Sequence, residues 1–422
     1  MIALIADDLT GASDAGVQFA RRGLVTRVLF DLADPAATRG VEALAVDTDS
    51  RALPPRAAYA RVRQLADQLR GARPEHLYKK VDSTLRGNLG AEIDAVMDAF
   101  GLPLAIVAPA FPALGRTTRQ SVHHLGGTPV HQTEIGRDPR APVRESNVVR
   151  LLESQSQRRV GAVPLGTVAE GPEAIRRRVD EQAVGGVALL VCDAETDGGL
   201  RAIAEALGHR RDLLWVGSAG LAEALAEPLR LTSRLARAPA GAAPVGPVLL
   251  VAGSLSATTR QQVAAVAARP GVATVELDPL ALLAGADVGR AESARCRGAL
   301  RSALANGSDC VLAVGARSQN QNQNQNRDAA YRIADALGSL AAGCARAYPL
   351  GGLILIGGDT ARAVCRHLGV TGVDLLSEVE PGVPLGRLVG QTAPRLLAVT
   401  KAGAFGSEDT LVHALDRLKG DS

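Results

Sequence analysis

The chain has 422 residues, which is more than one ordinary hydrophobic core accommodates, so we expect two domains. Hydrophobic residues make up 46% and charged residues 22% of the chain, a balance typical of globular proteins and not of disordered ones. The formal net charge is only +3, and no basic stretch is interleaved with aromatic residues, which argues against nucleic-acid binding. No apolar run is long enough to span a bilayer.

The cysteines and the first residues indicate the compartment. The five cysteines are odd in number and scattered, without a C-x-x-C pair, which argues against a disulfide framework and a zinc site. The opening MIALIADDLTGA has no basic segment and soon reaches two aspartates, which indicates a buried strand and not a signal peptide. We therefore expect a soluble cytoplasmic protein.

In the first half of the chain, short apolar runs alternate with longer amphipathic segments. This alternation is typical of parallel α/β architecture. Helical patterns cover Arg56–Leu69 and Ala91–Phe100. The predicted strands of this half are Ile2–Ala6, Thr26–Phe30, Ala43–Asp47, His76–Val81, Leu104–Ala108, Val187–Cys192 and Leu213–Val216.

The composition then changes at residues 232–247, TSRLARAPAGAAPVGP, which lack a periodic apolar face and are predicted to link two domains, 1–231 and 248–422. The fold class predicted is two α/β domains with largely parallel sheets and an interdomain cleft, where a ligand is expected. The tract QNQNQNQN at 319–326 cannot build a core and is expected to be a surface loop. The predicted strands of the second domain are Val248–Ala252, Ala273–Leu277, Cys310–Val314, Leu353–Ile356 and Leu396–Thr400.

A first polar motif, ADDLTGASDAG, follows the first predicted strand. The strand ends at Asp7 and Asp8, and Thr10 and Gly11 then open a helix. Ligands of open α/β sheets bind outside the carboxyl ends of the strands, so both aspartates are candidates. One of them could serve only as the helix cap, but two adjacent carboxylates exceed what a cap needs.

A second motif, YKKVDSTLRGNLGAE at residues 78–92, lies between a predicted strand and a predicted helix. Because side chains alternate along a strand, Lys80 and Asp82 are expected on one face and Lys79 on the other. Ammonium, carboxylate, hydroxyl and guanidinium groups together suit a polyhydroxylated anion, whereas a surface salt-bridge cluster usually lacks so many hydroxyls. The polar residues of this motif are Lys79, Lys80, Asp82, Ser83, Thr84, Arg86 and Asn88.

Two further segments belong to the same half. In DTDSR, after the third predicted strand, Arg51 could bind a carboxylate bidentately. Residues 108–147 contain several histidines without metal-like spacing, and the adjacent His123 and His124 would face apart on a strand, so zinc is not expected.

Lysine is rare in this arginine-rich chain. Its only lysines are Lys79, Lys80, Lys401 and Lys419. A lysine retained against this bias indicates a site that needs a compact ammonium group and not a planar guanidinium. Chance retention is the alternative, and we prefer it for Lys419.

Three glycine-bearing turns follow predicted strands in the second half: GSLSATT at 253–259, GGDTA at 357–361 and KAGAFG at 401–406. Each offers backbone N–H groups at a strand end, and the first two also offer a helix N-terminus, an arrangement that binds phosphates. One such turn is weak evidence, because Ser, Thr and Asp are ordinary helix caps, but three favour a nucleotide site. The sequence has no Gly-Lys dipeptide for a Walker A motif and no G-x-G-x-x-G after its first strand.

Taken together, these motifs resemble the four-carbon acid sugar kinase family. The resemblance covers nearly the whole chain in family order, and only the QN tract departs from it. It implies ATP-dependent phosphorylation of threonate, erythronate or their 2- or 3-oxo forms, with the sugar acid in the first domain and the nucleotide in the second. The matching pieces are ADDLTGASD, DSR, KKVDSTLRGN, the FPALGRTT to RDPRAPVRESN stretch, GSAGLAEAL, GSLSATT, GGDTA and KAGAFG.

The resemblance and the residue chemistry together predict two sets of binding residues. Mg²⁺ is expected with the ATP, because phosphoryl transfer requires neutralised phosphates. The predicted substrate-binding residues are Asp8, Arg51, Lys80, Asp82, Ser83, Thr84 and Arg86. The predicted nucleotide-binding residues are Ser254, Ser256, Gly357, Gly358, Asp359, Thr360 and Gly403.

The catalytic base is not settled by the sequence. We favour Asp8, with Asp82 second, and Asp359 could instead serve the metal or a helix terminus. Two other classes stay open: a sugar-acid aldolase or dehydratase with a Schiff base on Lys80, and a non-catalytic sugar-acid-binding protein. The first does not explain the three anion-binding turns, and the second does not explain two differently equipped domains. Sugar acid and ATP are the expected ligands, with no nucleic acid and no membrane; a homodimer stays open.

Overall fold

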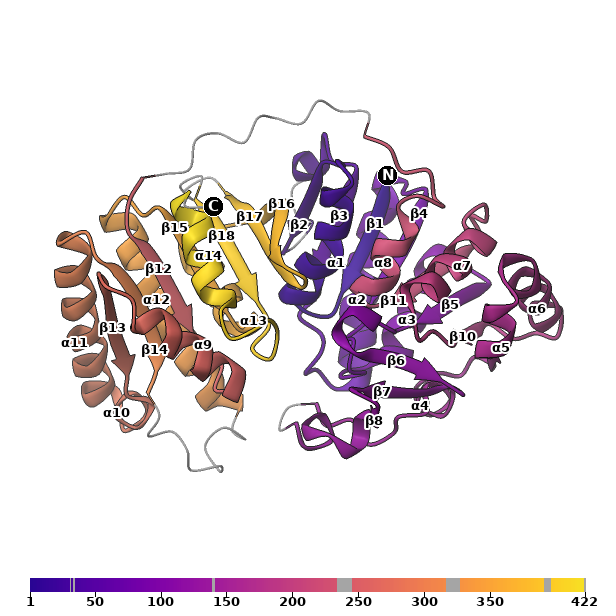
Figure 1. Ribbon diagram of the computed structural model, residues 1–422, viewed down its shortest axis with the longest axis horizontal. Coiled ribbons are helices and arrows are strands. Elements are labelled where there is room, and N and C mark those ends of the chain that lie inside the picture. Colours follow the sequence, from indigo (N-terminus) through magenta and orange to yellow (C-terminus); the bar gives the residue numbers. More distant parts are fainter. Residues whose placement is uncertain are drawn as a thin grey trace. The chain divides into compact units, whose positions relative to one another are not determined.

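The computed structural model describes residues 1–30, 32, 35–138, 141–233, 245–315, 327–390 and 396–420. The chain forms two compact units, Met1–Arg237 and Ala238–Ser422 (Figure 1). The predicted fold class, two α/β domains with largely parallel sheets, is confirmed. The QN tract and residues 234–244 of the predicted linker lie outside the described residues.

The first unit is built around one parallel sheet. Its strand order is β2-β3-β1-β4-β11-β5-β10-β9, and every neighbouring pair is parallel. The central strands are buried on both faces, which explains why they are continuous apolar runs. The strands are β1 Ile2–Ala6, β2 Thr26–Leu29, β3 Ala43–Asp47, β4 His76–Lys80, β5 Leu104–Ala108, β9 Val160–Val163, β10 Leu189–Cys192 and β11 Leu213–Gly217.

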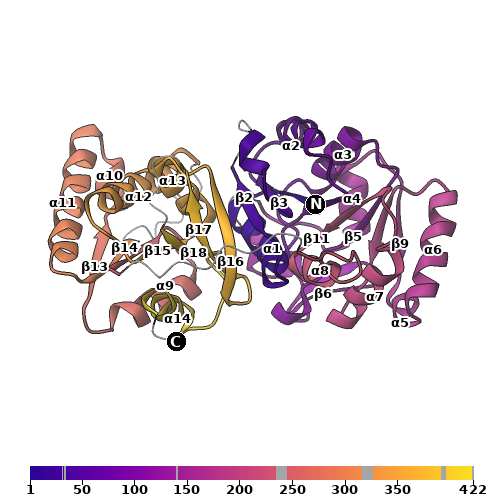
Figure 2. The ribbon, with the colours of Figure 1, turned by 90° about the horizontal axis from the view of Figure 1, so that it is seen from above.

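Helices cover both faces of this sheet (Figure 2). Helix α8 contacts α1 and α7 on one face, and α3 contacts α2 and α4 on the other. The helices are α1 Leu9–Arg21, α2 Pro55–Leu69, α3 Leu89–Phe100, α4 Val148–Gln155, α5 Leu165–Ala169, α6 Pro172–Val184, α7 Asp197–Leu207 and α8 Ala219–Leu225. A small antiparallel sheet is inserted after β5, with strands β6 Arg116–Arg119, β7 Val122–Leu125 and β8 Thr128–Pro129.

The sheet of the second unit has the order β13-β14-β12-β15-β18-β17-β16. The first five strands are parallel, and β17 and β16 extend the sheet in antiparallel fashion. The strands are β12 Val248–Ala252, β13 Val272–Leu277, β14 Asp309–Val314, β15 Gly352–Ile356, β16 Gly372–Glu380, β17 Val383–Val389 and β18 Leu397–Lys401.

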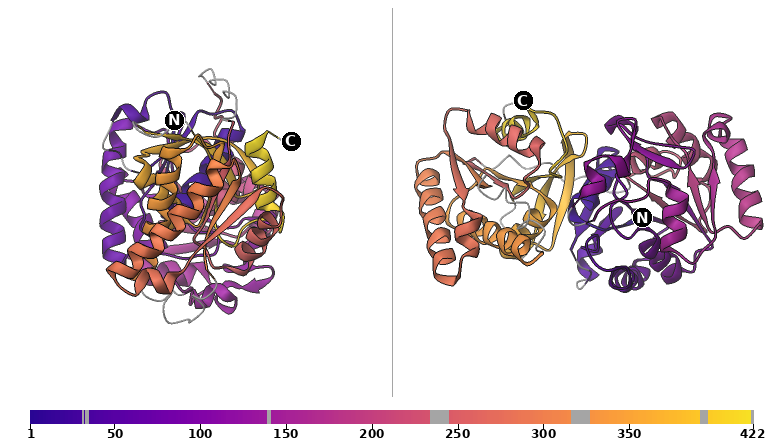
Figure 3. Two further views of the ribbon diagram at one scale, coloured as in Figure 1. Left: turned by 90° about the vertical axis from the view of Figure 1, so that its left-hand side faces the viewer. Right: turned by 90° about the horizontal axis from the view of Figure 1, so that it is seen from below.

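Helices α9 and α14 pack together on one face of this second sheet, and α10 to α13 cover the other (Figures 2 and 3). Their bounds are α9 Ala257–Ala267, α10 Pro279–Leu283, α11 Ala286–Ala305, α12 Arg327–Ala347, α13 Gly358–Leu368 and α14 Thr410–Lys419. Within the described ranges of both units, no helix is both long and apolar enough to cross a membrane.

The predicted strands are confirmed, most of them to within one residue. Ile2–Ala6, Ala43–Asp47, Leu104–Ala108 and Val248–Ala252 begin and end as predicted. The sequence analysis missed β6 to β9 and the hairpin of β16 and β17. Strand β9 is short and largely half-buried, and β16 is half-buried over its last residues, so neither forms a continuous apolar run.

Candidate functional sites

In the first unit, polar side chains follow three neighbouring strands at the same edge of the sheet. Strand β1 pairs with β3 and β4, with Ala6 opposite both Asp47 and Lys80. The segments that follow these strand ends therefore lie side by side, at the edge where open α/β sheets bind ligands. They contain Asp7 and Asp8 after β1, Arg51 after β3, and residues 81–86 after β4.

The guanidinium group of Arg51 lies at the centre of this edge. Its Nε and Nη2 donate to the two carboxylate oxygens of Asp7, at 2.7 and 2.9 Å, and its Nη1 donates to Asp8 Oδ2 at 2.7 Å. Asp82 Oδ1 lies 3.7 Å from Nη2. Arg51 was predicted to bind a substrate carboxylate bidentately. That role stays a prediction, but in the structure Asp7 already takes the bidentate contact.

The two adjacent aspartates differ in their electrostatics. Burial raises the pKa of the Asp7 carboxyl, but the charge and hydrogen bonds of Arg51, together with the charges of Lys79 and Lys80, outweigh it and hold that pKa below its usual range. For Asp8, burial together with the charge of Asp7 outweighs Arg51, so its pKa is raised. Asp8 Oδ1 also accepts a hydrogen bond from Gly11 N at 2.7 Å and caps α1. Asp8 is thus both the helix cap and a member of the site.

Asp82 is held more completely than Asp8. Arg86 donates to both of its oxygens, Nε to Oδ2 at 2.9 Å and Nη2 to Oδ1 at 3.0 Å, and Thr84 donates to Oδ2 through its backbone N and its hydroxyl. Burial raises the pKa of Asp82, but Arg86 and Arg51 outweigh this and hold it well below the usual range. A carboxylate so stabilised as an anion is a weak base. Asp82 therefore orders the turn.

The strand-alternation argument does not extend to this turn. Strand β4 ends at Lys80, one residue before its predicted end, so strand alternation does not place Asp82 on the face of Lys80. A tight turn places it instead, in which Leu85 has a positive φ of 66°. Such a backbone conformation is unusual for a residue with a side chain and is typical of functional loops.

The two lysines of β4 have separate roles. Lys80 Nζ donates to Val81 O at 2.8 Å, and a Cβ atom on Gly11 would lie 3.1 Å from the same Nζ, which places this ammonium group beside Asp8. Lys79 is buried and forms an ion pair with Glu92 Oε2 at 2.8 Å. Asp7, Lys79 and Glu92 were not in the predicted substrate set. A carboxylate on the buried face of α3 was the signal that could have indicated this pair.

His123 connects the inserted sheet to the same edge. Its side chain is fully buried, and burial lowers its pKa to about 4, so the imidazole is neutral. Nε2 donates to Ser83 O and Nδ1 accepts from Thr118 Oγ1, both at 2.9 Å. The ring therefore fixes the predicted substrate loop. Among the residues that the structure describes, no three His, Cys, Asp or Glu residues gather in a way that could hold a metal ion.

In the second unit, the three glycine-bearing turns follow three neighbouring parallel strands. Ala252 of β12 pairs with Ile356 of β15, and Ile356 pairs with Lys401 of β18, so the turns begin at one edge. Ser256 Oγ and Thr259 Oγ1 each donate to Gly403 O at 2.8 Å. The structure thus brings together the three turns that the sequence analysis singled out.

These turns approach one another so closely that side chains would not fit. A Cβ atom on Gly403 would overlap Ser254 Oγ, and one on Gly253 would overlap Thr360 Oγ1. Gly357 has a φ of 97°, which favours glycine, and it directly precedes α13. Backbone N–H groups at a crowded, glycine-lined edge beside a helix N-terminus are a suitable site for phosphate oxygens.

Lys401 forms hydrogen bonds within the third turn, residues 401–406. Its buried ammonium group donates to the carbonyls of Ala402, Gly403 and Phe405, at 2.9, 3.1 and 2.8 Å. An ammonium group has three N–H donors, so all three are used by the turn. Burial lowers the pKa of Lys401 to about 8. Lys401 therefore stabilises the conformation of the third turn, a role that the sequence analysis did not assign.

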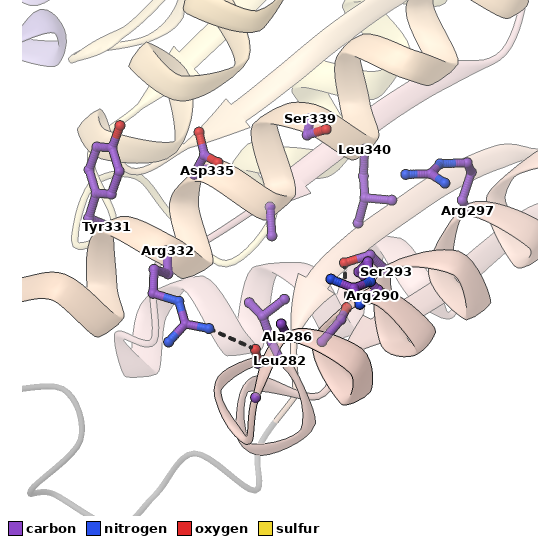
Figure 4. Close-up of a pocket in the computed structure, with 13 residues that line it drawn as sticks. Leu282, Ala286, Arg290, Ser293, Arg297, Tyr331, Arg332, Asp335, Ser339 and Leu340 are labelled. Carbon is purple, nitrogen blue, oxygen red and sulfur yellow. Dashed lines mark hydrogen bonds between the residues drawn. The ribbon is translucent and has the colours of Figure 1, made fainter.

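A separate groove of about 590 Å³ lies among α10, α11 and α12 (Figure 4). Arg332 on α12 donates across it to Leu282 O at 3.3 Å. It contains none of the predicted site residues. The residues that line it are Leu282, Gly285, Ala286, Gly289, Arg290, Ser293, Arg297, Tyr331, Arg332, Asp335, Ala336, Ser339 and Leu340.

The chain thus has two α/β units, one with a strand edge of charged side chains and one with a strand edge of glycine-bearing turns. Comparison with known families agrees: residues 2–225 match the sugar-binding N-terminal domain family, and residues 249–411 match the nucleotide-binding C-terminal domain family. The chain therefore belongs to the class of proteins that join a sugar-binding N-terminal domain to a nucleotide-binding C-terminal domain.

Two curated relatives are similar over nearly their whole length. A D-threonate kinase of Bordetella bronchiseptica is 39% identical, covering 99% of this chain and 97% of the relative. A 3-oxo-tetronate kinase of Methylobacterium radiotolerans is 36% identical, covering 98% of each. A crystal structure of a protein from Salmonella typhimurium LT2 is 27% identical, with a TM-score of 0.81 and 98% of each chain covered. The chain belongs to the four-carbon acid sugar kinase family.

Proposed function

We propose that this protein transfers the γ-phosphoryl group of ATP to a hydroxyl group of a four-carbon sugar acid such as threonate, erythronate or an oxo-tetronate. The observation that carries the proposal is the pairing of two unlike strand edges in one chain. The first offers carboxylates, ammonium and guanidinium groups, and the second offers glycine turns. Relatives named D-threonate kinase and 3-oxo-tetronate kinase support it.

The nucleotide is assigned to the second unit. Its phosphates are bound by the backbone N–H groups of the turns at Ser254–Ser256, Gly357–Thr360 and Gly403, together with the N-terminus of α13. Mg²⁺ usually binds to one or two carboxylates and to substrate phosphates, so the exposed Asp359 in the first turn of α13 fits it. When bound, Mg²⁺ neutralises charge on the phosphates.

The sugar acid is assigned to the first unit. Arg51 has five N–H donors, of which the hydrogen bonds to Asp7 and Asp8 use three. The remaining donors, with Lys80 and Arg86, bind the carboxylate of the acid. Ser83 and Thr84 offer hydroxyls at the same edge.

Asp8 is the base in this proposal. Its side chain is 22% exposed, against 4% for Asp7 and 9% for Asp82, so substrate can reach it. Its raised pKa makes it a better proton acceptor than Asp7 or Asp82, whose pKa values are lowered. Asp8 accepts the proton of the substrate hydroxyl as that oxygen attacks the γ-phosphorus and the bond to ADP breaks.

The experiment is a screen of the purified protein against four-carbon acids, with ADP release as the measurement. Threonate, erythronate and the oxo-tetronates are tested with ATP and Mg²⁺, each beside the corresponding neutral polyol. We expect acid-dependent ADP release and little turnover of the polyols, because the site is built around groups that bind an anion. Equal turnover of acid and polyol, or no release with any acid, contradicts the proposal.

A further inference from the structure

Two residues at the start of α3 hold the loop that carries Arg51. Asn88 Nδ2 donates to Ser50 O at 3.3 Å and to Leu53 O at 2.9 Å. Glu92 Oε1 accepts from Ser50 Oγ at 2.8 Å. Asn88 and Glu92 are four residues apart, so they lie on one face of the helix, and that face grips the loop on both sides of Arg51.

Asn88 occupies the N-cap position of α3, but its side chain does not cap the helix. It precedes the first residue of α3, where an asparagine side chain normally accepts a hydrogen bond from a backbone N–H of the first turn. Its side chain makes no such capping bond and reaches the carbonyls of the loop instead. The helix therefore loses a cap, and the loop gains two hydrogen bonds.

Glu92 is itself fixed from below. It is 1% exposed, and its other oxygen, Oε2, forms the 2.8 Å ion pair with the fully buried Lys79. Lys79 Nζ also donates to Lys80 O at 2.7 Å. Burying two charges costs desolvation, and apolar residues often serve stability as well or better. The buried Lys79–Glu92 ion pair lies next to the proposed sugar-acid site. A role in orienting Ser50 explains this ion pair better than a contribution to stability alone.

The Arg51 side chain and its loop need such support. Asp49 has a positive φ of 49°, a conformation that costs free energy in a residue with a side chain. Gly87, next to Asn88, has a φ of 102°, and a Cβ atom there would lie 3.3 Å from Asp7 Oδ2 and 3.4 Å from Arg51 Cγ. The start of α3 thus packs directly against both Arg51 and its partner.

We propose that Asn88 and Glu92 are positioning residues of the sugar-acid site. They hold the loop 48–53 in the conformation in which Arg51 bridges Asp7 and Asp8, and so they set the site's affinity for the acid and the orientation of Asp8. This inference rests on the proposed function, because it concerns the same site. Neither residue contacts the reacting groups; both act through Arg51.

The test is a double-mutant cycle with Arg51. Asn88→Ala and Glu92→Gln should each lower kcat/KM for the acid on the order of tenfold, the effect of losing one or two hydrogen bonds, and leave KM for ATP unchanged. In an Arg51→Lys background the same changes should add less than about twofold, because the bidentate contact that they position is already gone.

Asp94→Asn is the matched control. Asp94 lies on the same helix, is also largely buried and accepts from Ser156 Oγ at 2.8 Å, but within the described part of the chain its hydrogen bonds and ion pairs do not reach the Arg51 loop. It should leave kcat/KM for the acid near the wild-type value. If Glu92→Gln fails to fold because Lys79 is left unpaired, Asn88→Ala, which keeps the ion pair, carries the same test.

Two results overturn the inference: losses that are fully additive with Arg51→Lys, or an equal loss in Asp94→Asn. Failure of the proposed function is distinguishable, because it appears as absence of acid-dependent ADP release in the wild type. In that event, calorimetric titration of the same variants with threonate decides the inference without turnover. Asn88→Ala binding threonate as tightly as the wild type, or no threonate binding by the wild type, then rejects it.

Discussion

The carboxyl-end edges of the two sheets are built in opposite ways. In the first unit, side chains dominate: Arg51 bridges two aspartates, and Arg86 holds a third. In the second unit, the backbone dominates: three glycine-bearing turns meet so closely that Gly253 and Gly403 have no room for a side chain. Charged side chains can form ion pairs and hydrogen bonds with the individual carboxylate and hydroxyl groups of a small acid. Backbone N–H groups suit phosphates, which present many equivalent oxygens.

The buried lysines show the same contrast. Lys79 has a carboxylate partner, Glu92, at 2.8 Å and belongs to a network of charged side chains. Lys401 donates only to backbone carbonyls among its described hydrogen bonds, and burial lowers its pKa to about 8. One lysine supports charged side chains and the other supports a turn. Three experiments test the contrast between the two edges: a substitution of Asp8, a substitution of Gly403 and a change of pH.

The largest expected effect is that of Asp8→Asn. Asparagine is as good a helix cap as aspartate, so α1 should stay intact, but an amide cannot accept the substrate proton. We expect kcat to fall by roughly 10²- to 10⁴-fold, the usual contribution of a general base, while ATP affinity stays near that of the wild type. Steady-state turnover and calorimetric titration with ATP measure the two quantities.

Asp82→Asn and Asp359→Asn are the comparison variants. Asp82→Asn should weaken acid binding more than turnover, because it releases Arg86 and the turn around Leu85. If Asp8→Asn keeps full turnover while Asp359→Asn loses it without losing ATP, the base belongs to the second unit and the assignment of Asp8 is wrong.

The next effect is expected for Gly403→Ala. The added methyl group would overlap Ser254 and force the first and third turns apart. We expect ATP affinity to fall on the order of tenfold, in keeping with the cost of overpacking, and acid affinity to stay unchanged. Gly298→Ala is the matched control, since Gly298 lies in α11 with nothing within 4 Å of the added atom. Equal ATP affinity in both variants would remove the third turn from the nucleotide site.

The smallest effect is a pH dependence. If the charge of Lys401 holds the third turn, ATP affinity should fall several-fold as the pH rises through about 8, while acid affinity does not follow the same curve. Isothermal titration between pH 7 and 9 measures both. Lys401→Met should bind ATP more weakly throughout and lose this step; a step that persists in Lys401→Met assigns it to another group.

The sign of the stability effect separates this step from unfolding. The pKa of Lys401 in the folded chain, about 8, lies below its ordinary value of 10.5. Between these values the unfolded chain binds more protons, so Lys401 by itself makes the free energy of unfolding increase as the pH rises. A loss of ATP affinity above pH 8 therefore cannot arise from destabilisation by this group, and melting temperatures over the same interval check it.

Much of the candidate site could be predicted because it lies at strand ends. Asp8, Arg51 and Gly403 each follow an apolar run, and within each unit parallel topology brings such positions to the same edge of the sheet. Their partners could not be predicted in the same way. Glu92 meets Ser50 across 42 residues of chain, and Asn88 meets Leu53 across 35, through packing of α3 that no local pattern encodes.

The sequence by itself determined the α/β class, the parallel strands and the strand-end motifs, because buried parallel strands require continuous apolar runs and turns require glycine or capping residues. Tertiary structure alone decided which of the three carboxyl groups has a raised pKa. Asp7, Asp8 and Asp82 look alike in the sequence, but bidentate arginines hold the pKa values of Asp7 and Asp82 down, while burial and the charge of Asp7 raise that of Asp8. These effects depend on distances of a few ångströms between distant residues, which only the folded chain fixes.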